Sequence, residues 1–302
     1  MAAESSDESQ PAFRFSDFTS EPTLMLQPIL GYEEKPVVSL EEAIHPLIPL
    51  VPEVERMVWT VKQKNFDGQH VLTNDEAASI LLYTLEWKPR DKSFYIILNN
   101  TLQAADRQLL KPWFLYLRLI MTSLAKLPAY SHPLTVYRGV NLDLSEQYPK
   151  GSTVTWWRFS SCTTSIDVLR NKKFFGQSGT RTLFTIECST AKSIQQYSFF
   201  PVEEEVLLPP ARRFQVKGCL DASNDLHIIQ LIEIQSTFPL INPVPQPPVL
   251  QQIPHPSVTE STPSVTETIK AFNSPIYNDP NLQKHSNAIY TDPVIIPLDQ
   301  TP

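Results

Sequence analysis

Three acidic residues stand side by side in the stretch FFPVEEEVLLPP, residues 199–210. If the chain is extended there, alternate side chains share a face, so Glu203 and Glu205 point together and Glu204 points away. Two carboxylates that converge on one face could act as the acid/base pair that cleaves a glycosidic bond. A solvated strand entrance is the other interpretation, and the stretch alone leaves both open.

A basic residue and a glycine follow each other in VYRGV, at the end of an apolar run. Because glycine has no Cβ, Gly139 would let a ligand approach the backbone closely. The guanidinium of Arg138 offers a fork of donors that suits phosphate. Arg138 could equally pair with a carboxylate at the edge of the core.

Small hydroxyl and thiol residues follow an aromatic-rich segment in FSSCTTS, residues 159–165. Hydroxyls at the end of a strand, such as that of Ser161, can orient a ligand or a carboxylate by hydrogen bonding. They can also bond only the backbone of their own turn.

The segments that must position these groups come first in the chain, and their apolar residues follow a helical pattern. Apolar residues recur at helical spacing in segments near 53–66, 74–86, 93–104 and KPWFLYLRLIMTSLAKLP. Thr73 and Glu76 form a capping-box pattern at the start of the second segment. Pro112 is tolerated in the first turn of the last one. A stripe in that helix is typical of a core face rather than a cofactor site: Trp113, Leu117, Ile120, Met121 and Leu124.

After Pro133 the pattern changes to short segments rich in β-branched and aromatic residues. These predict strands at 135–140, 153–161, 181–188, 204–208, 212–218 and 226–234. IDVLRNKKFF, residues 166–175, predicts one intervening helix. Helices first and strands second favour an α+β fold over alternating α/β.

Composition narrows the class of protein. The 302 residues carry a net charge of −7, which argues against a general nucleic-acid binder. The 3 cysteines include no CxxC, and the 6 histidines lack metal-ligand spacing, so we expect no disulfide framework and no metal. No apolar run reaches the roughly 18 residues of a membrane span. The acidic N-terminus is unlike a secretory signal, so we expect a cytoplasmic protein without a membrane partner.

Three regions are expected along the chain. Residues 1–22 are polar and acidic, which predicts disorder. Residues 23–238 form the folded part, divided into a helical lobe, 23–133, and a β-rich core, 134–238. Residues 239–302 read as a disordered, proline-rich tail. Its PVPQPP is a weak candidate ligand for an SH3- or WW-type groove, with a plain solvated tail as the alternative.

The order of the polar groups along the chain resembles the R-S-E class of mono-ADP-ribosyltransferases, and most of all its arginine-specific branch. The similarity covers residues 134–234 and is carried by VYRGV, WWRFSSCTTS, FFG, RTLFTI and YSFFPVEEEVLLPPARRF. The helical part, 36–133, looks like the lobe that precedes the sheets in such enzymes. The resemblance implies an α+β fold with an N-terminal helical lobe and a mostly antiparallel β-sandwich that binds NAD.

The resemblance also implies roles for the polar residues. Arg138 would hold the phosphates and the nicotinamide-side ribose of NAD, and the main chain at Gly139 would contact the nicotinamide amide. Ser161 would orient both NAD and the catalytic glutamate. Cys162 and Thr163 depart from the Ser-Thr-Ser pattern of the family, although Thr163 keeps a hydroxyl that could serve the cofactor.

The acidic stretch maps onto the family's E-x-E motif. Glu205 would be the catalytic glutamate and would stabilise positive charge on the ribose as nicotinamide leaves. Glu203 marks arginine specificity, because a neighbouring carboxylate can bind a guanidinium and take its proton. Phe199 and Phe200 lie where the family's substrate-recognition loop carries an aromatic residue.

An aromatic residue against nicotinamide is also implied, at Phe174 or, as an alternative, Phe175. The expected activity is transfer of ADP-ribose from NAD, a co-substrate, to arginine side chains of an acceptor protein. An NAD glycohydrolase would use the same residues. A non-catalytic NAD-binding or adaptor module with a working proline-rich tail is a third interpretation.

Overall fold

The computed structural model describes residues 25–64, 66, 71–170, 175–176 and 178–245. All of them belong to one compact unit, Met1–Val249. The predicted N-terminal disorder and the PVPQPP segment fall outside or at the limit of the described residues, so they stay predictions.

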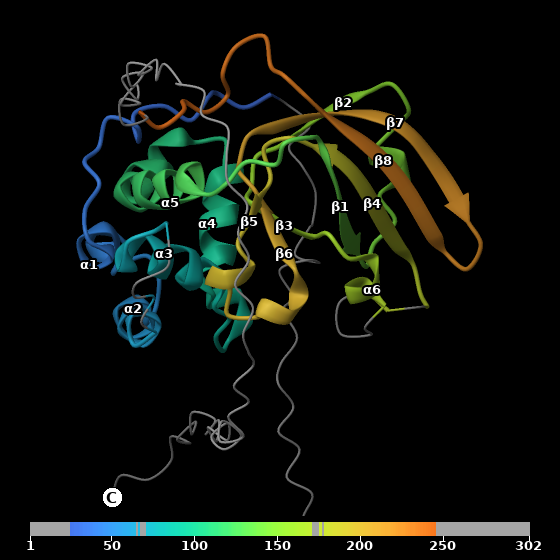
Figure 1. Cartoon of the computed structure of the whole chain (residues 1–302). Coiled ribbons are helices and arrows are strands. Elements are labelled where there is room, and N and C mark those ends of the chain that lie inside the picture. The colour runs from blue at the N-terminus through green and yellow to red at the C-terminus, as the bar shows by residue number, and fades with distance from the viewer. Residues whose placement is uncertain (1–24, 65, 67–70, 171–174, 177, 246–302) are drawn as a thin grey trace, which may run out of the picture. The chain divides into compact units, whose positions relative to one another are not determined.

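The first half of the described chain folds into helices, as predicted. The α-helices are α1 (Leu40–Ile44), α2 (Val54–Lys62), α3 (Asn74–Thr84), α4 (Phe94–Gln103) and α5 (Phe114–Lys126). Short 3-10 helices lie between them: η2 (His45–Leu47), η3 (Arg90–Lys92) and η4 (Arg107–Trp113). These helices gather on one side of the sheet (Figure 1). Within the described residues, none has the length and hydropathy needed to cross a bilayer.

Helix α3 begins with the predicted capping box. Thr73 Oγ1 accepts from the backbone N–H of Glu76, and the Glu76 carboxylate accepts from the backbone N–H of Thr73. The other oxygen of Glu76 accepts from Lys126 Nζ of α5 at 2.6 Å. One side chain therefore both starts α3 and ties it to α5.

Helix α5 begins later than the sequence suggested. Pro112 lies inside η4, and α5 starts at Phe114. Proline has no N–H and its ring crowds the carbonyl four residues before it, so the α-helical ladder forms only beyond it. The apolar stripe is core, as predicted: Trp113, Leu117, Ile120 and Leu124 are buried, and Met121 packs against them.

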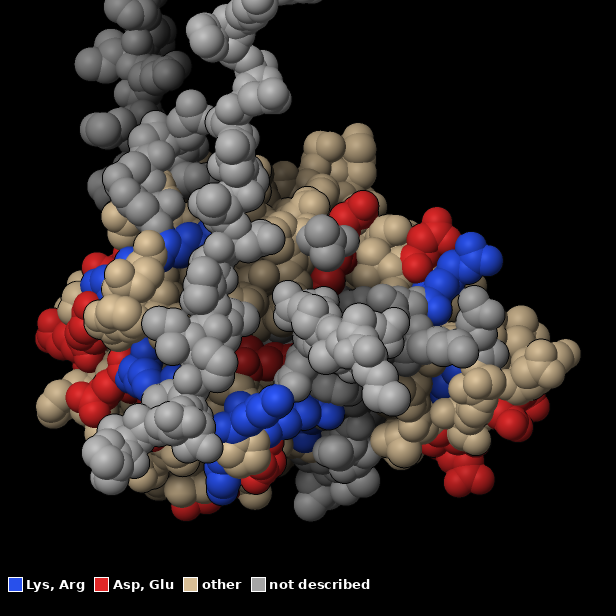
Figure 2. All heavy atoms as spheres, turned by 90° about the horizontal axis from the view of Figure 1, so that it is seen from below, with Lys and Arg blue, Asp and Glu red and all other residues tan. Residues whose placement is uncertain are grey.

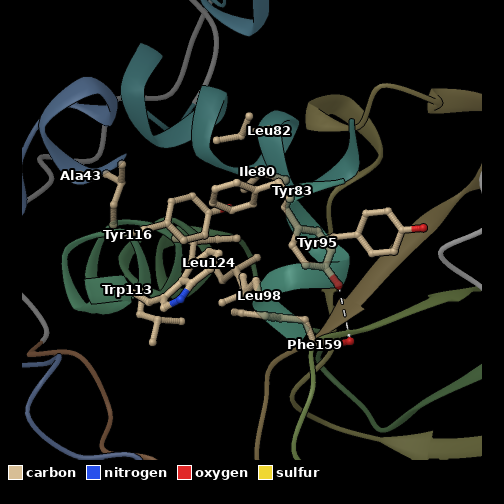
Figure 3. Packing of buried hydrophobic residues seen from close by; sticks show 14 of the residues in the cluster. Ala43, Ile80, Leu82, Tyr83, Tyr95, Leu98, Trp113, Tyr116, Leu124 and Phe159 are labelled. Atoms are coloured by element: carbon tan, nitrogen blue, oxygen red, sulfur yellow. Dashed lines mark hydrogen bonds between the residues drawn. The ribbon is translucent and has the colours of Figure 1, made fainter. Parts of the chain in front are cut away.

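Aromatic side chains fill the core between the helices and reach the sheet (Figure 3). Phe94 packs edge-on against Trp113 and Tyr116, with ring centroids 5.3 and 4.6 Å apart. Tyr83 packs against Phe159, which belongs to the strand region, at 5.4 Å. The helical and strand regions thus share one hydrophobic core.

The second half forms one hydrogen-bonded sheet of 8 strands among the described residues, in the order β2-β7-β8-β4-β1-β3-β6-β5. The strands are β1 (Leu134–Val140), β2 (Thr153–Trp156), β3 (Ser160–Thr163), β4 (Arg181–Cys188), β5 (Lys192–Ser193), β6 (Glu205–Leu208), β7 (Arg212–Ala222) and β8 (Leu226–Ile234). Every neighbouring pair is antiparallel except β4 and β8. The α+β class is confirmed, whereas the sandwich arrangement stays a prediction.

The predicted strand 153–161 is two strands. β2 pairs with β7, and β3 pairs with β6 and β1. Trp156 lies in the core under the sheet, whereas Trp157 and Phe159 lie in the core shared with the helices. The strand is interrupted after Trp156 because neighbouring aromatic side chains are buried in two different hydrophobic clusters.

Two further elements differ from expectation. The helix predicted over 166–175 is the short α6 (Ile166–Leu169), and residues 171–174 lie outside the described ones. β7 extends to Ala222, beyond the predicted end at 218, because it pairs with β8 along its whole second half. The turn that follows uses positive φ at Asn224 and Asp225.

The two ends of the described core are held together, which corrects the predicted start of the tail at 239. Ile29 and Ile241 form a parallel bridge, and Ile29 N donates to Leu240 O at 2.8 Å. Leu240, Ile241 and Val244 are buried in the helical core. The folded core therefore extends beyond residue 239, because these apolar side chains complete it.

Candidate active site

A buried arginine joins β1 to β3 where their backbone pairing stops. β1 pairs with β3 only at Tyr137 and Thr163, whereas it pairs with β4 along its whole length. One position further, Arg138 Nη1 donates to the carbonyl of Ser161 at 2.7 Å. Arg138 and Ser161 are 3% and 1% exposed. The structure thus brings together two of the residues that the sequence singled out.

Ser161 is held in place from the helical side. Two residues earlier, the backbone N–H of Phe159 donates to Asn99 Oδ1 of α4 at 3.1 Å. The carbonyl of Phe159 accepts from Asn99 Nδ2 and from Tyr83 Oη, both at 3.4 Å. Among the described residues, the buried hydroxyl of Ser161 has no hydrogen-bond partner. Because such a group costs about 1–3 kcal/mol, it is suited to a bound polar ligand.

The acidic stretch has a different backbone from the one expected. Glu203 ends the 3-10 helix η7 (Pro201–Glu203), Glu204 has a left-handed φ of 47°, and β6 starts only at Glu205. The alternation argument for an extended chain was therefore wrong in its premise. The left-handed turn still separates the side chains as predicted: Glu203 and Glu205 are buried and Glu204 is exposed.

Strand β3 fixes this turn from the other side. Glu205 lies opposite Thr163 in the β3–β6 ladder. Thr163 Oγ1 donates to the carbonyl of Glu203 at 3.0 Å, and Thr164 Oγ1 donates to the carboxylate of Glu204 at 3.1 Å. The hydroxyl of Thr163, expected to serve the cofactor, is engaged by the main chain of the acidic turn.

An aromatic ring lies against the glycine of β1. A Cβ on Gly139 would come within 2.5 Å of Phe175 Cδ2, so the ring occupies the space that the missing side chain leaves. The guanidinium of Arg181 lies 5.5 Å from the centroid of the same ring and donates to Gly176 O at 2.8 Å. Phe174, the first choice from the sequence, lies outside the described residues. Phe175, its alternative, borders the site.

The buried thiol of Cys162 lies between the two opposite charges, because Arg138 bonds the carbonyl of Ser161 and Glu205 pairs with Thr163. Burial raises the pKa of Cys162 to about 12, Arg138 lowers it, and Glu205 raises it further. The site therefore combines a guanidinium, a hydroxyl and buried carboxylates, which can bind an anionic ligand and stabilise a positive charge that develops on it.

The sequence matches one family model over residues 39–238, described as ART: NAD:arginine ADP-ribosyltransferase. The chain belongs to the NAD:arginine ADP-ribosyltransferase family. The matched range contains every described site residue named above, together with the helices that position them. The resemblance noted in the sequence is thus confirmed at the level of the family.

Individual members of this family match shorter stretches. A putative NAD(+)--arginine ADP-ribosyltransferase of Mycobacterium avium is 33% identical over 117 residues, 38% of this chain and 14% of that protein. NAD(P)(+)--arginine ADP-ribosyltransferase 1 of Gallus gallus is 37% identical over 90 residues, 30% of this chain and 26% of that protein. The matches therefore span about a quarter or less of these relatives.

Solved ADP-ribosyltransferases are more distant. The Vis toxin from Vibrio splendidus has a TM-score of 0.42 at 23% identity, over 68% of this chain and 90% of that one. The eucaryotic mono-ADP-ribosyltransferase ART2.2 has a TM-score of 0.45 at 19% identity, over 66% and 85%. Membership of the family rests on the family model and not on these likenesses.

The structure adds a site residue that the sequence did not indicate. Ser198 is fully buried, and its hydroxyl donates to Glu205 Oε2 at 2.8 Å. Ser198 Oγ also accepts from the backbone N–H of Phe200 at 3.1 Å. In the ADP-ribosyltransferase sequence pattern this serine is only one more hydroxyl before two aromatic residues. No spacing rule could have linked it to a carboxylate seven positions later.

The aromatic pair expected to recognise the substrate is anchored to the helices. The backbone N–H of Phe199 donates to Thr84 Oγ1, at the end of α3, at 3.0 Å. Phe199 is 49% exposed, whereas Phe200 packs against the small cluster that contains Phe175. Phe199 is therefore the ring available to a partner, and Phe200 supports it at a centroid distance of 5.4 Å.

Acidic and basic side chains are interspersed on the face shown in Figure 2. Within the described ranges, no group of three His, Cys, Asp or Glu side chains could hold a metal ion. The three cysteines, Cys162, Cys188 and Cys219, are free thiols.

Proposed function

We propose that this chain transfers ADP-ribose from NAD to arginine side chains of acceptor proteins and releases nicotinamide. The observation that carries the proposal is the buried carboxylate of Glu205 at the start of β6, opposite Thr163 of the strand whose Ser161 carbonyl accepts from Arg138. This arrangement falls within the range that matches the arginine-specific family model.

The residues of the site fit NAD as a co-substrate. Arg138 supplies a guanidinium for the phosphates, since its fork of donors matches phosphate oxygens. The hydroxyl of Ser161, which has no partner among the described residues, would gain one from the bound dinucleotide. The ring of Phe175 against Gly139 offers an apolar wall for the nicotinamide.

Glu205 would stabilise the reacting sugar. When the bond between ribose C1′ and the nicotinamide nitrogen breaks, its electron pair leaves with nicotinamide and positive charge develops on the ribose. A buried carboxylate stabilises that charge more strongly than an exposed one, because less water screens it. The hydrogen bond from Ser198 holds the carboxylate in one orientation.

Glu203 would prepare the acceptor. The pKa of a guanidinium lies above about 12, so the group stays protonated at neutral pH, and in that charged form it is a poor nucleophile. The carboxylate of Glu203 can bind it and take that proton as a new bond forms between its nitrogen and ribose C1′. The exposed ring of Phe199 would contact the acceptor beside it.

The direct test incubates the full chain with labelled NAD and an arginine-rich acceptor, and maps the modified residues by mass spectrometry. We expect label on arginine with the wild type and none with Glu205→Gln. Label that persists in Glu205→Gln, or that lies on other residue types, would contradict the assignment.

A second variant separates transfer from hydrolysis. Glu203→Gln should lose transfer to arginine while keeping part of the NAD hydrolysis, because only the acceptor step needs its carboxylate. Equal loss of both activities would contradict this division. Free ADP-ribose without protein labelling in the wild type would instead identify an NAD glycohydrolase. Failure of NAD to raise the thermal midpoint would favour a non-catalytic adaptor that does not bind NAD.

A further inference from the structure

A polar cavity lies away from the site of Arg138 and Glu205. Its volume is about 480 Å³, within the range of small-molecule sites. It is lined by the turn after β4, the start of β7, the end of β8 and the segment 239–243. β6 runs from Glu205 to Leu208, and Arg212 starts the next strand, so the two sites lie at opposite ends of β6.

Two arginines of this cavity, Arg212 and Arg213, form no ion pair in the described part of the chain. Arg213 Nε is buried and has no hydrogen-bond partner there, while Arg212 Nε donates only to Pro210 O at 3.3 Å. Burial lowers the pKa of Arg212, and the nearby charge of Glu233 partly offsets this. Both side chains are half-buried, and the buried Nε of Arg213 lacks an acceptor, so an anion in the cavity would supply one.

The carboxylate of Glu233, the acidic residue of the cavity, already accepts hydrogen bonds from the turn after β4. Glu233 Oε2 accepts from the backbone N–H groups of Ser189 and Thr190 at 2.8 and 3.1 Å. Glu233 Oε1 accepts from Thr190 Oγ1 at 2.6 Å. These bonds fix the turn after β4, and the carboxylate of Glu233 makes no hydrogen bond or ion pair with Arg212 or Arg213 in the described part of the chain.

The remaining walls supply one more polar group and an apolar surface. The hydroxyl of Ser236 is buried and, among the described residues, has no partner. Met121, Leu240 and Ile241 line the cavity with apolar side chains. A ligand that fits both kinds of wall has an anionic group at one end and a less polar body at the other.

We propose that this cavity binds a phosphate-bearing small molecule, with the phosphate between Arg212, Arg213 and Ser236 and the body against Met121 and Leu240. Phosphate is the favoured anion because a guanidinium binds two of its oxygens at once. The cavity shares no residue with the site of the proposed transferase reaction. Binding here is therefore independent of that reaction.

The test measures binding of inorganic phosphate and of AMP to the full chain by calorimetry and by the shift in thermal midpoint. We expect both to bind the wild type, and Arg213→Gln to weaken binding by about tenfold or more. Ser236→Ala should weaken it by a smaller factor. Arg56→Gln, a change at an exposed arginine of α2, is the matched control and should leave binding unchanged.

Two results would overturn the proposal. One is binding of neither probe by the wild type, or equal binding by wild type and Arg213→Gln. The other is binding that is lost in Arg138→Lys and kept in Arg213→Gln, which would place the phosphate in the transferase site. Arg213→Lys keeps the charge without the fork, so it should bind with intermediate affinity. Thermal midpoints without ligand establish that each variant is folded.

Discussion

At the scale of single residues, one hydroxyl controls the orientation of the proposed catalytic carboxylate. Ser198 donates to Glu205 Oε2 and accepts from the N–H of Phe200, so it cannot rotate without losing one of these bonds. The hydroxyl of Ser161, which the sequence assigned to this task, makes no hydrogen bond among the described residues. Ser198 is thus a positioning residue, and Ser161 is left for the substrate.

Replacing Ser198 with alanine should lower kcat by roughly 10–100-fold, because a hydrogen bond to a charged group is worth about 1.5–3 kcal/mol. The KM for NAD should change little, since Ser198 acts through Glu205. Ser198→Thr keeps the hydroxyl and should restore part of the rate. Steady-state kinetics decide the point, with exposed Ser131→Ala as the control. A purely structural role would instead lower the thermal midpoint and leave kcat per folded molecule intact.

The ring of Phe175 requires a glycine at position 139. Because Phe175 fills the space where a Cβ would lie, Gly139→Ala must displace the ring. We expect a loss of about 1–3 kcal/mol in unfolding free energy from overpacking, and a higher KM for NAD. Adding Phe175→Leu should recover stability, because a smaller side chain makes room. If Gly139→Ala were as stable as the wild type, the contact would not constrain the site.

At the scale of elements, α4 determines where β3 begins. Asn99 bonds both the N–H and the carbonyl of Phe159, so the strand is fixed two residues before Ser161. These hydrogen bonds take the place of strand pairing, which is absent at residues 157–159, between β2 and β3. The helical half of the molecule is therefore part of the proposed site and not only a support.

Asn99→Ala should reduce the unfolding free energy by about 1–3 kcal/mol, because it leaves the buried backbone N–H of Phe159 without its partner. It should also lower activity by more than the loss of folded protein explains, since Ser161 would no longer be fixed. Denaturant unfolding and activity per folded molecule are the measurements. Asn100→Ala, at the exposed neighbour, should match the wild type in both.

The sequence predicted those elements whose signals are local. The capping box at Thr73 predicted the start of α3, and segments rich in β-branched residues predicted β1, β4 and β8. The break at Trp157 was invisible, because tryptophan has the same strand preference whichever core it enters. The left-handed turn at Glu204 was equally hidden, since non-glycine residues seldom adopt that conformation. Arg138 and Glu205 were found through their order along the chain, whereas Ser198 needed the fold.

At the scale of the whole molecule, the first and last segments that the structure describes form one clasp. Ile29 bridges to Ile241, and Tyr32 Oη donates to the carbonyl of Asn242. The segment that closes the clasp also lines the cavity of Arg212 and Arg213. Stability and phosphate binding should therefore depend on the same few residues.

A chain that ends after Phe238 should be less stable than one that ends after Pro245. The shorter chain lacks Leu240, Ile241 and Val244, and burial of each contributes roughly 1.5–3 kcal/mol. Thermal midpoints of the two truncated proteins test this, and phosphate binding should be lost with the shorter one. Equal midpoints would show that the clasp adds nothing to stability.

The clasp also sets an order of events during synthesis. Tyr32 and its acceptor at Asn242 are 210 residues apart, so one half of the contact leaves the ribosome long before the other. Until Leu240 and Ile241 have been synthesised, the side of the helical core that they cover stays exposed to water. The nascent chain can complete its helical core only after the whole sheet has been translated.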